Sequence, residues 1–174
     1  YKYDLYVSFK ITDNKLTVTH KVVNTNSEEM YFSIGAHPAF NCTIGDTLTF
    51  ECNETLYSER IDHDSVITGN KDLILSNDNK IEITQHLFDK DALIFSNVKS
   101  KYVILDEKEN NKSIKFTFGT PPFLAIWAKP GAPYVCIEPW YGVNDSYDKV
   151  ASFSQKRGIQ KLTPGKEFEF SWCA

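Results

Sequence analysis

Hydrophobic and polar residues alternate along much of the chain. From Tyr3 to Ile11 every second side chain is apolar or aromatic, and a similar alternation resumes from Leu16 to Val22 after the turn-like sequence TDNK. A period of two is typical of a β-strand, and two such runs around a short turn predict a β-hairpin. We therefore expect the chain to open with a hairpin that has one buried face and one more solvated face.

The same pattern predicts strands along the rest of the chain. Candidate strands are the segments 30–34, 48–52, 80–84, 92–95, 102–105, 113–118, 123–128, 134–138 and 168–172. Sequences rich in Gly, Pro, Asn and Asp separate them, and residues 106–112 have the composition of an exposed hairpin tip. Residues 63–72 favour a loop, and residues 138–148 favour a short helical turn or a structured loop.

These elements predict one all-β domain that spans residues 1–174. The segments amount to about a dozen short strands, arranged in two packed sheets or in one strongly curved, barrel-like sheet. We find no internal repeat, linker or low-complexity tract in the chain.

Composition narrows the choice of partner. The net charge is −4 and no run of Lys or Arg is present, so nucleic acid is not an expected partner. No apolar segment approaches the roughly 20 residues that span a bilayer, so no membrane association is expected. Aromatic residues make up 14% of the chain, which suits half-buried sheet faces and also sugar-binding clefts.

The cysteines and histidines predict neither disulfides nor a metal site. Cys42, Cys52, Cys136 and Cys173 form no CxxC pair, which favours a reduced, cytoplasmic chain. None has a basic neighbour in sequence that would activate its thiol, although a partner in space stays open. Three of the four histidines lack the spacing of metal ligands with one another, so we expect no metal and no cofactor. They are His20, His63 and His86.

The sequence GAHPAFN breaks the strand pattern at Gly35. Glycine permits a sharp change of backbone direction, and Pro38 stiffens the residues after His37. An imidazole at such a position is either a structural side chain or a proton donor at the mouth of a pocket. The residues of this motif alone do not decide between the two.

A second break follows Glu138 in the sequence YVCIEPWYGVND. Alternation places Cys136 and Glu138 on one face of a strand and Val135 and Ile137 on the other. A carboxylate at the end of an apolar run is either a surface residue or a partly buried one. In the second case its pKa rises, which favours proton transfer with a partner such as His37.

Together these segments resemble the aldose 1-epimerase (mutarotase) family, most closely its bacterial branch associated with lactose and galactose genes. SIGAHPAFN resembles the family's histidine motif, and VCIEPWYGVND resembles its glutamate motif. LFDKDALIF and SQKRGIQKLTPGKEFEF fit further segments in the expected order. The resemblance covers most of the chain, and the first two motifs are its specific part.

The resemblance implies a galactose-mutarotase-like antiparallel β-sandwich, or supersandwich. It also implies a cofactor-free reaction that interconverts the α and β anomers of a free aldohexose such as galactose or glucose. By motif match, His37 falls on the catalytic acid, Glu138 on the catalytic base and Asp91 on an acid that holds sugar hydroxyls. Asp89 precedes the same strand and is the alternative to Asp91.

Residue type alone adds three aromatic candidates for a platform under a sugar ring. These are Phe40, Trp140 and Trp127. A non-catalytic carbohydrate-binding or sugar-sensing β-sandwich is the alternative to an enzyme. The particular sugar, its phosphorylation and the oligomeric state are left open at this point.

The family also has a further N-terminal half. This chain begins at Tyr1, without a methionine and already inside a strand pattern. We therefore expect it to be the C-terminal part of a larger mutarotase-like domain.

Overall fold

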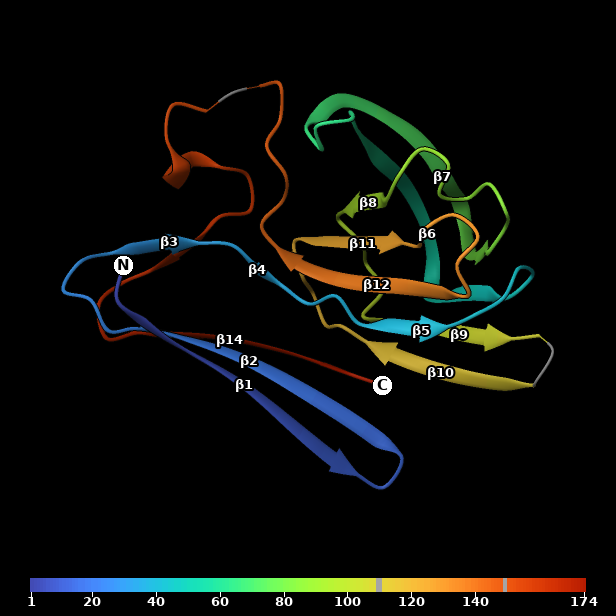
Figure 1. Cartoon of the computed structure of the whole chain (residues 1–174), viewed down its shortest axis with the longest axis horizontal. Coiled ribbons are helices and arrows are strands. Elements are labelled where there is room, and N and C mark those ends of the chain that lie inside the picture. Colours follow the sequence, from blue (N-terminus) through green and yellow to red (C-terminus); the bar gives the residue numbers. More distant parts are fainter. Residues whose placement is uncertain (109–110, 149) are drawn as a thin grey trace.

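The computed structural model describes residues 1–108, 111–148 and 150–174 and consists almost entirely of β-strands (Figure 1). The strands are β1 (Tyr3–Thr12), β2 (Lys15–Asn24), β3 (Met30–Phe32), β4 (Ile34–Gly35), β5 (Ala39–Asn41), β6 (Thr47–Ile61), β7 (Ile67–Glu82), β8 (Leu93–Ser96), β9 (Tyr102–Glu107), β10 (Lys112–Thr117), β11 (Phe123–Trp127), β12 (Tyr134–Tyr141), β13 (Gln160–Leu162) and β14 (Glu167–Cys173). One 3₁₀ turn, η1, spans Phe153–Gln155. The predicted all-β class is confirmed.

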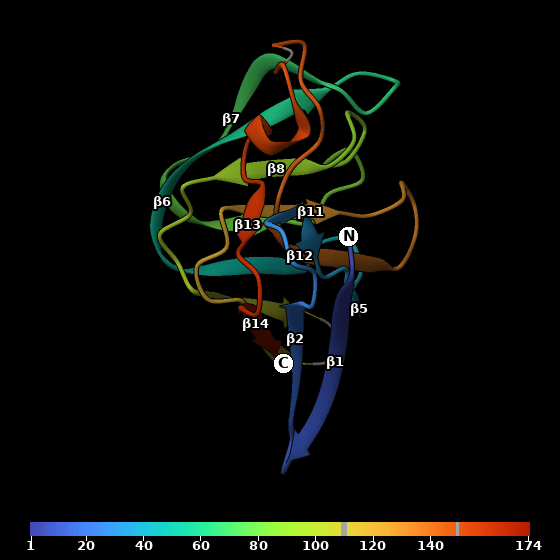
Figure 2. The same ribbon diagram turned by 90° about the vertical axis from the view of Figure 1, so that its left-hand side faces the viewer.

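Twelve of the strands form one antiparallel sheet in the described part of the chain. Its order is β1-β2-β14-β10-β9-β6-β8-β11-β12-β4, with β5 also paired to β12 and β7 to β6. β3 and β13 form a separate two-stranded sheet. The large sheet curls around its core, and β1, β2 and β14 extend from it as a long ribbon in both views (Figures 1 and 2).

The main core lies on one face of this curled sheet. Its fully buried members include Leu48, Phe95, Leu105, Phe116 and Ile137, which come from five different strands. On β12 the predicted alternation holds, since Val135 and Ile137 belong to this core. A second buried cluster lies around Ile94 and Ala125, and partly buried Trp127 and Trp140 pack against it. β12 therefore has the main core on one side and the candidate site on the other.

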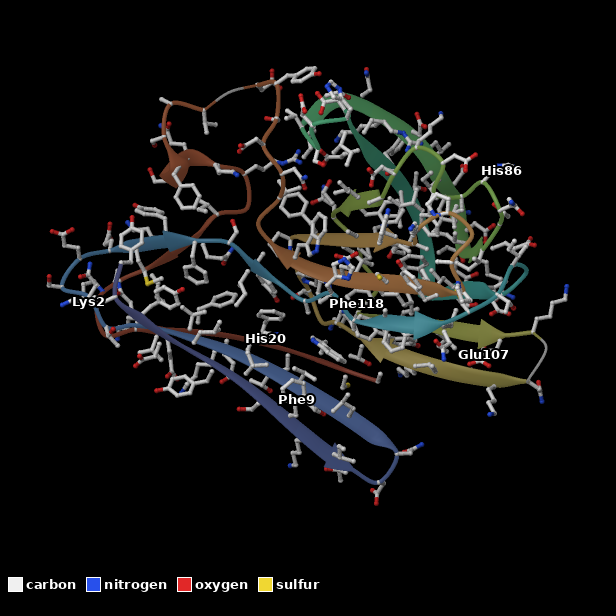
Figure 3. All side chains as sticks on the ribbon, viewed as in Figure 1. Lys2, Phe9, His20, His86, Glu107 and Phe118 are labelled. Carbon is white, nitrogen blue, oxygen red and sulfur yellow. The ribbon has the colours of Figure 1, made fainter. Side chains whose placement is uncertain are left out.

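The opening hairpin forms, but the buried face predicted for its first strand does not. β1 pairs with β2 from Tyr3 opposite Asn24 to Thr12 opposite Lys15. All ten residues of β1 are exposed, including Phe9 at 71% and Ile11 at 78%. β1 is the edge strand of the sheet, and its apolar side chains, among them Phe9 labelled in Figure 3, are exposed.

Two predicted loops are partly strand. β12 continues past Glu138 through Pro139 to Tyr141, so residues 138–148 contain no helical turn and Glu138 is not at a strand end. Pro139 is tolerated because its ring nitrogen needs no partner, while its carbonyl accepts a hydrogen bond from Ala36 N. Likewise residues 67–72 begin β7, because β6 continues far enough to pair with them.

The predicted hairpin around residues 106–112 is confirmed in its arms. Glu107 on β9 pairs with Lys112 on β10, and residues 109 and 110 of the tip lie outside the described residues. None of the described helical segments is long and apolar enough to cross a membrane.

Candidate functional site

His37 lies in a short interruption between β4 and β5, two strands that both pair with β12. Gly35 on β4 is opposite Trp140, and Ala39 on β5 is opposite Cys136. Between these pairs, Ala36 N donates to the Pro139 carbonyl and Ile137 N donates to the Pro38 carbonyl. The same register runs through both strands, so it places His37 directly across from Glu138.

The two predicted proton-transfer residues meet in the structure. His37 Nε2 lies 3.4 Å from Glu138 Oε1. The His37 side chain is 61% exposed, whereas the Glu138 side chain is only 4% exposed. A solvent-accessible imidazole thus lies above a buried carboxylate, and both are residue types that serve as general acids and bases.

The environment of Glu138 keeps its proton affinity high. Burial raises the pKa of this carboxyl above its ordinary value of 4.5, because the ionised form loses hydration. The positive charge of His37 and a hydrogen bond from Trp140 act in the opposite direction and lower the pKa. In that bond Trp140 Nε1 donates to Glu138 Oε2 at 3.2 Å. The result is a carboxylate that is both held in place and more basic than usual.

A cavity of about 460 Å³ opens beside this pair, within the size range typical of small-molecule sites. Its walls come from the segment before His37, from β12 and from the loop that follows β12. The lining residues beyond the pair are Ser33, Ile34, Gly35, Ala36, Trp140, Gly142, Val143, Asn144 and Lys156.

Two glycines are required by close packing at this cavity. A Cβ atom on Gly35 would lie 2.8 Å from Trp140 Cδ1, so β4 can approach the indole this closely only because residue 35 has no side chain. Gly142 has a φ of 128° and a Cβ there would lie 2.3 Å from Ser33 Oγ. Gly35 was expected to permit an unusual backbone turn, but close approach is what it provides.

The aromatic candidates separate into two groups. Trp140 lines the cavity, and the ring of Trp127 meets the His37 ring edge-on at a centroid distance of 6.3 Å. Phe40 is not brought to the site: it pairs with Val135 and packs against Phe116 in the main core. Residues 37 and 40 are three apart in an extended segment, so they face opposite sides of the sheet.

Asp91 lies in the turn just before β8, with a φ of 74°. Its Oδ1 accepts a hydrogen bond from Ala92 N at 2.7 Å, and the residue is exposed. Asp89 instead accepts from the His86 ring at 2.8 Å, well out on the surface. Neither is among the described residues that line the cavity beside His37.

Sequence reasoning missed a third group at the site. Cys136 is buried next to the pair, and ligand atoms of His37, Cys136 and Glu138 all lie within 4.8 Å of one another. These are residue types that bind Zn²⁺. Burial, the largest cause, and the nearby Glu138 charge raise the pKa of the Cys136 thiol to about 11. The signal was present in the shared face of residues 136 and 138, but His37 is distant in sequence.

A larger cavity of about 1050 Å³ adjoins the first and shares Asn144 and Lys156 with it. Buried Glu59 lies in its wall and accepts a hydrogen bond from Arg157 Nη2 at 2.6 Å. Cross-strand neighbours connect Glu59 through Ile94 and Ala125 to Glu138. At roughly 4.8 Å per strand, the backbones of the two glutamates are about 14 Å apart along one sheet face.

Residues 1–171 match the family model described as aldose 1-epimerase. The chain is 27% identical to Protein LacX, plasmid, of Lactococcus lactis subsp. lactis, and the match covers 94% of this chain and 58% of that protein. Two solved structures are similar in fold. They are a galactose mutarotase related enzyme from Lactobacillus acidophilus (28% identity, TM-score 0.87) and a galactose mutarotase-like protein from Lactobacillus casei ATCC 334 (27% identity, TM-score 0.85).

The curled antiparallel sheet therefore defines a galactose mutarotase-like β protein. The chain belongs to the aldose 1-epimerase family, as its matched residues show. Each of the two structural matches covers 98% of this chain but only 60% and 62%, respectively, of the matched chain. The chain thus spans about three-fifths of the length of these relatives.

Proposed function

We propose that this chain carries the acid and base of an aldose 1-epimerase that interconverts the α and β anomers of a free aldohexose such as galactose or glucose. The observation that carries the proposal is the 3.4 Å approach of His37 Nε2 to Glu138 Oε1 at the edge of a cavity. Family membership supports it, and no cofactor is required for the reaction.

In the first half of the reaction Glu138 accepts the proton of the C1 hydroxyl while protonated His37 donates to the ring oxygen. The bond between C1 and the ring oxygen breaks, and C1 becomes an aldehyde. Each proton transfer contributes about 10²- to 10⁴-fold to the rate. Rotation about the C1–C2 bond then presents the other face of the carbonyl.

Ring closure reverses the two roles. His37 takes the proton back from the attacking hydroxyl, and Glu138 returns its proton to the carbonyl oxygen. In the structure the two groups lie side by side, with His37 Nε2 3.4 Å from Glu138 Oε1. This arrangement suits the chemistry, since the C1 hydroxyl and the ring oxygen share one carbon and are themselves close together.

The neighbouring residues support a neutral sugar as the substrate. Trp140 offers an indole beside the acid and base, and we assign it to contact with a sugar ring. In the described walls of the adjoining larger cavity, acidic groups outnumber cationic ones, which disfavours a phosphorylated sugar. We retain Asp91 as a proposed ligand of sugar hydroxyls.

We also propose a cytoplasmic location for the protein, because all four cysteines are free.

A sugar-binding protein without catalysis is the second candidate. The observation that favours it is the high exposure of His37, because a general acid works best where water is excluded.

Polarimetry with freshly dissolved α-galactose and α-glucose separates the two candidates. An epimerase accelerates the optical change, and Glu138→Gln removes the acceleration. Calorimetric binding of the sugar without any acceleration would support the second candidate instead.

A further inference from the structure

The thiol of Cys136 lies at the site, and the proposed reaction does not use it. It lies on the same face of β12 as Glu138 and belongs to the set of ligand atoms within 4.8 Å of one another. The other cysteines have different surroundings: Cys42 packs in the main core, and Cys52 is exposed beside Glu54. Cys136 alone, among cysteines of the described structure, belongs to a cluster of His and Glu ligand atoms.

We propose that His37, Cys136 and Glu138 form a binding site for a single thiophilic divalent cation such as Zn²⁺. Imidazole nitrogen, thiolate sulfur and carboxylate oxygen are the ligand types that Zn²⁺ accepts in proteins. Three protein ligands and one open position is also the arrangement of zinc sites that bind an exogenous fourth ligand. Two of the three residues, His37 and Glu138, line the cavity, and water or a sugar hydroxyl from it completes the shell.

One of the three distances between ligand atoms already matches a tetrahedral site. Bond lengths of 2.0–2.3 Å at tetrahedral angles place neighbouring ligand atoms roughly 3.3–3.6 Å apart. His37 Nε2 and Glu138 Oε1 already meet this requirement at 3.4 Å. The sulfur lies within 4.8 Å of the other two ligand atoms, so it must come closer to them by at most about 1.2 Å. His37 is the most exposed of the three side chains and can change its rotamer most easily.

The bonding changes balance as follows. The S–H bond of Cys136 and the Nε2–H bond of protonated His37 break, Zn–S and Zn–N bonds form, the ionised Glu138 carboxylate adds a Zn–O bond, and both protons leave to solvent. The cation then occupies the lone pairs of His37 and Glu138 that the epimerase reaction uses for proton transfer. Metal binding itself is independent of the proposed function, whereas the inhibition that follows from it rests on that function.

The test titrates Zn²⁺ into the metal-free, untagged protein by calorimetry and uses Co²⁺ as a spectroscopic probe. We expect one site and a thiolate-to-Co²⁺ charge-transfer band. Cys136→Ser should abolish the band and weaken Zn²⁺ binding at least about 10-fold, the smallest loss typical of disturbing a metal site. His37→Asn should weaken binding similarly, and because its side chain is exposed it leaves the fold intact.

Cys52→Ser is the matched control. It also removes a thiol that lies 3.8 Å from a glutamate carboxylate, but Cys52 does not belong to the group of ligand atoms that contains His37. It should leave both the band and the affinity unchanged. The absence of a thiolate band in the wild-type protein overturns the proposal. So does equal Zn²⁺ affinity in wild-type, Cys136→Ser and His37→Asn proteins.

The inhibition arm compares each protein with its own rate without metal. Zn²⁺ should slow mutarotation by the wild-type protein, a chelator should restore it, and the Cys136→Ser protein should respond at least about 10-fold less sensitively. Failure of the metal arm with normal mutarotation contradicts only the metal site. A protein that binds Zn²⁺ as described but never accelerates mutarotation contradicts only the epimerase function.

Discussion

Glu138 Oε1 and His37 Nε2 lie 3.4 Å apart because β4 and β5 keep one register along β12 on both sides of the histidine. The carboxylate is almost fully buried and the imidazole is mostly exposed. Burial raises the pKa of the Glu138 carboxyl, while exposure leaves the His37 imidazole accessible to a substrate.

Replacing His37 by Asn removes the proposed general acid while leaving the backbone of the interruption unchanged. We expect kcat/KM for mutarotation to fall about 10²- to 10⁴-fold. His86→Asn is the matched control, because that exposed histidine also pairs with a carboxylate but lies away from the cavity. Equal losses in the two variants would show that the effect is not specific to the site.

The pH dependence of kcat/KM should reflect the raised pKa of Glu138. The base must be ionised to accept a proton, so activity falls as pH decreases through that pKa. Because burial raises the pKa of Glu138, the acidic limb should lie above the ordinary glutamate value of 4.5. A profile of kcat/KM against pH, which reports the pKa values of the free enzyme, checks this. An acidic limb at or below pH 4.5 would contradict it.

Trp140→Phe should move the same limb to higher pH. The substitution removes the indole N–H that donates to Glu138 Oε2, and this hydrogen bond is one of the two influences that lower the pKa of the carboxyl. Trp172→Phe is the control, since in the described structure Trp172 Nε1 makes no hydrogen bond. A shift in the opposite direction, or the same shift in both variants, would count against the account.

Glu138→Gln should stabilise the fold at neutral pH while removing activity. A carboxyl whose pKa is raised in the folded state lowers the free energy of unfolding when it is ionised. This loss of stability is absent below the unfolded pKa near 4.5, grows as pH rises towards the folded pKa, and persists above it. Thermal unfolding should therefore give a melting-temperature difference near zero at about pH 4 and a positive one at about pH 7. A difference that does not change with pH would be inconsistent with a raised pKa.

Arg157→Met should destabilise the fold, because Arg157 pairs with a buried carboxylate in the wall of the larger cavity. Glu59 is buried, and Arg157 is its closest cationic partner, while Lys71 Nζ is 3.8 Å away. We expect a loss of about 1–3 kcal/mol in the free energy of unfolding, because a buried carboxylate loses its hydrogen bond. Adding Glu59→Gln should recover part of this loss in a double-mutant cycle. Two fully additive effects would show that the pair is not coupled.

The alternating pattern predicted most of the strands, because strand formation depends on local side-chain periodicity. It could not predict that β1 is exposed, since burial depends on what packs against an edge strand. The pattern also predicted that this strand ends at Glu138, before Pro139. β12 continues because the carbonyl of Pro139, and not its nitrogen, bonds to the neighbouring segment.

The candidate site was predictable in its parts but not in its assembly. His37 and Glu138 each lie beside a break in the strand pattern of the sequence, and family resemblance pairs them. Their contact depends on a register between distant segments that no local pattern contains. The parity of residues 37 and 40 in an extended segment could have excluded Phe40 from the site. The parity of residues 136 and 138 already placed the cysteine beside the base.

Polarimetry of α-galactose and α-glucose mutarotation tests the central claim most directly. It compares the natural gene product that contains these 174 residues with its Glu138→Gln and His37→Asn variants. The account predicts clear acceleration by the wild-type protein and a loss of about 10²-fold or more in each variant. Wild-type rates in both variants, or no acceleration by the wild-type protein above buffer, would contradict it.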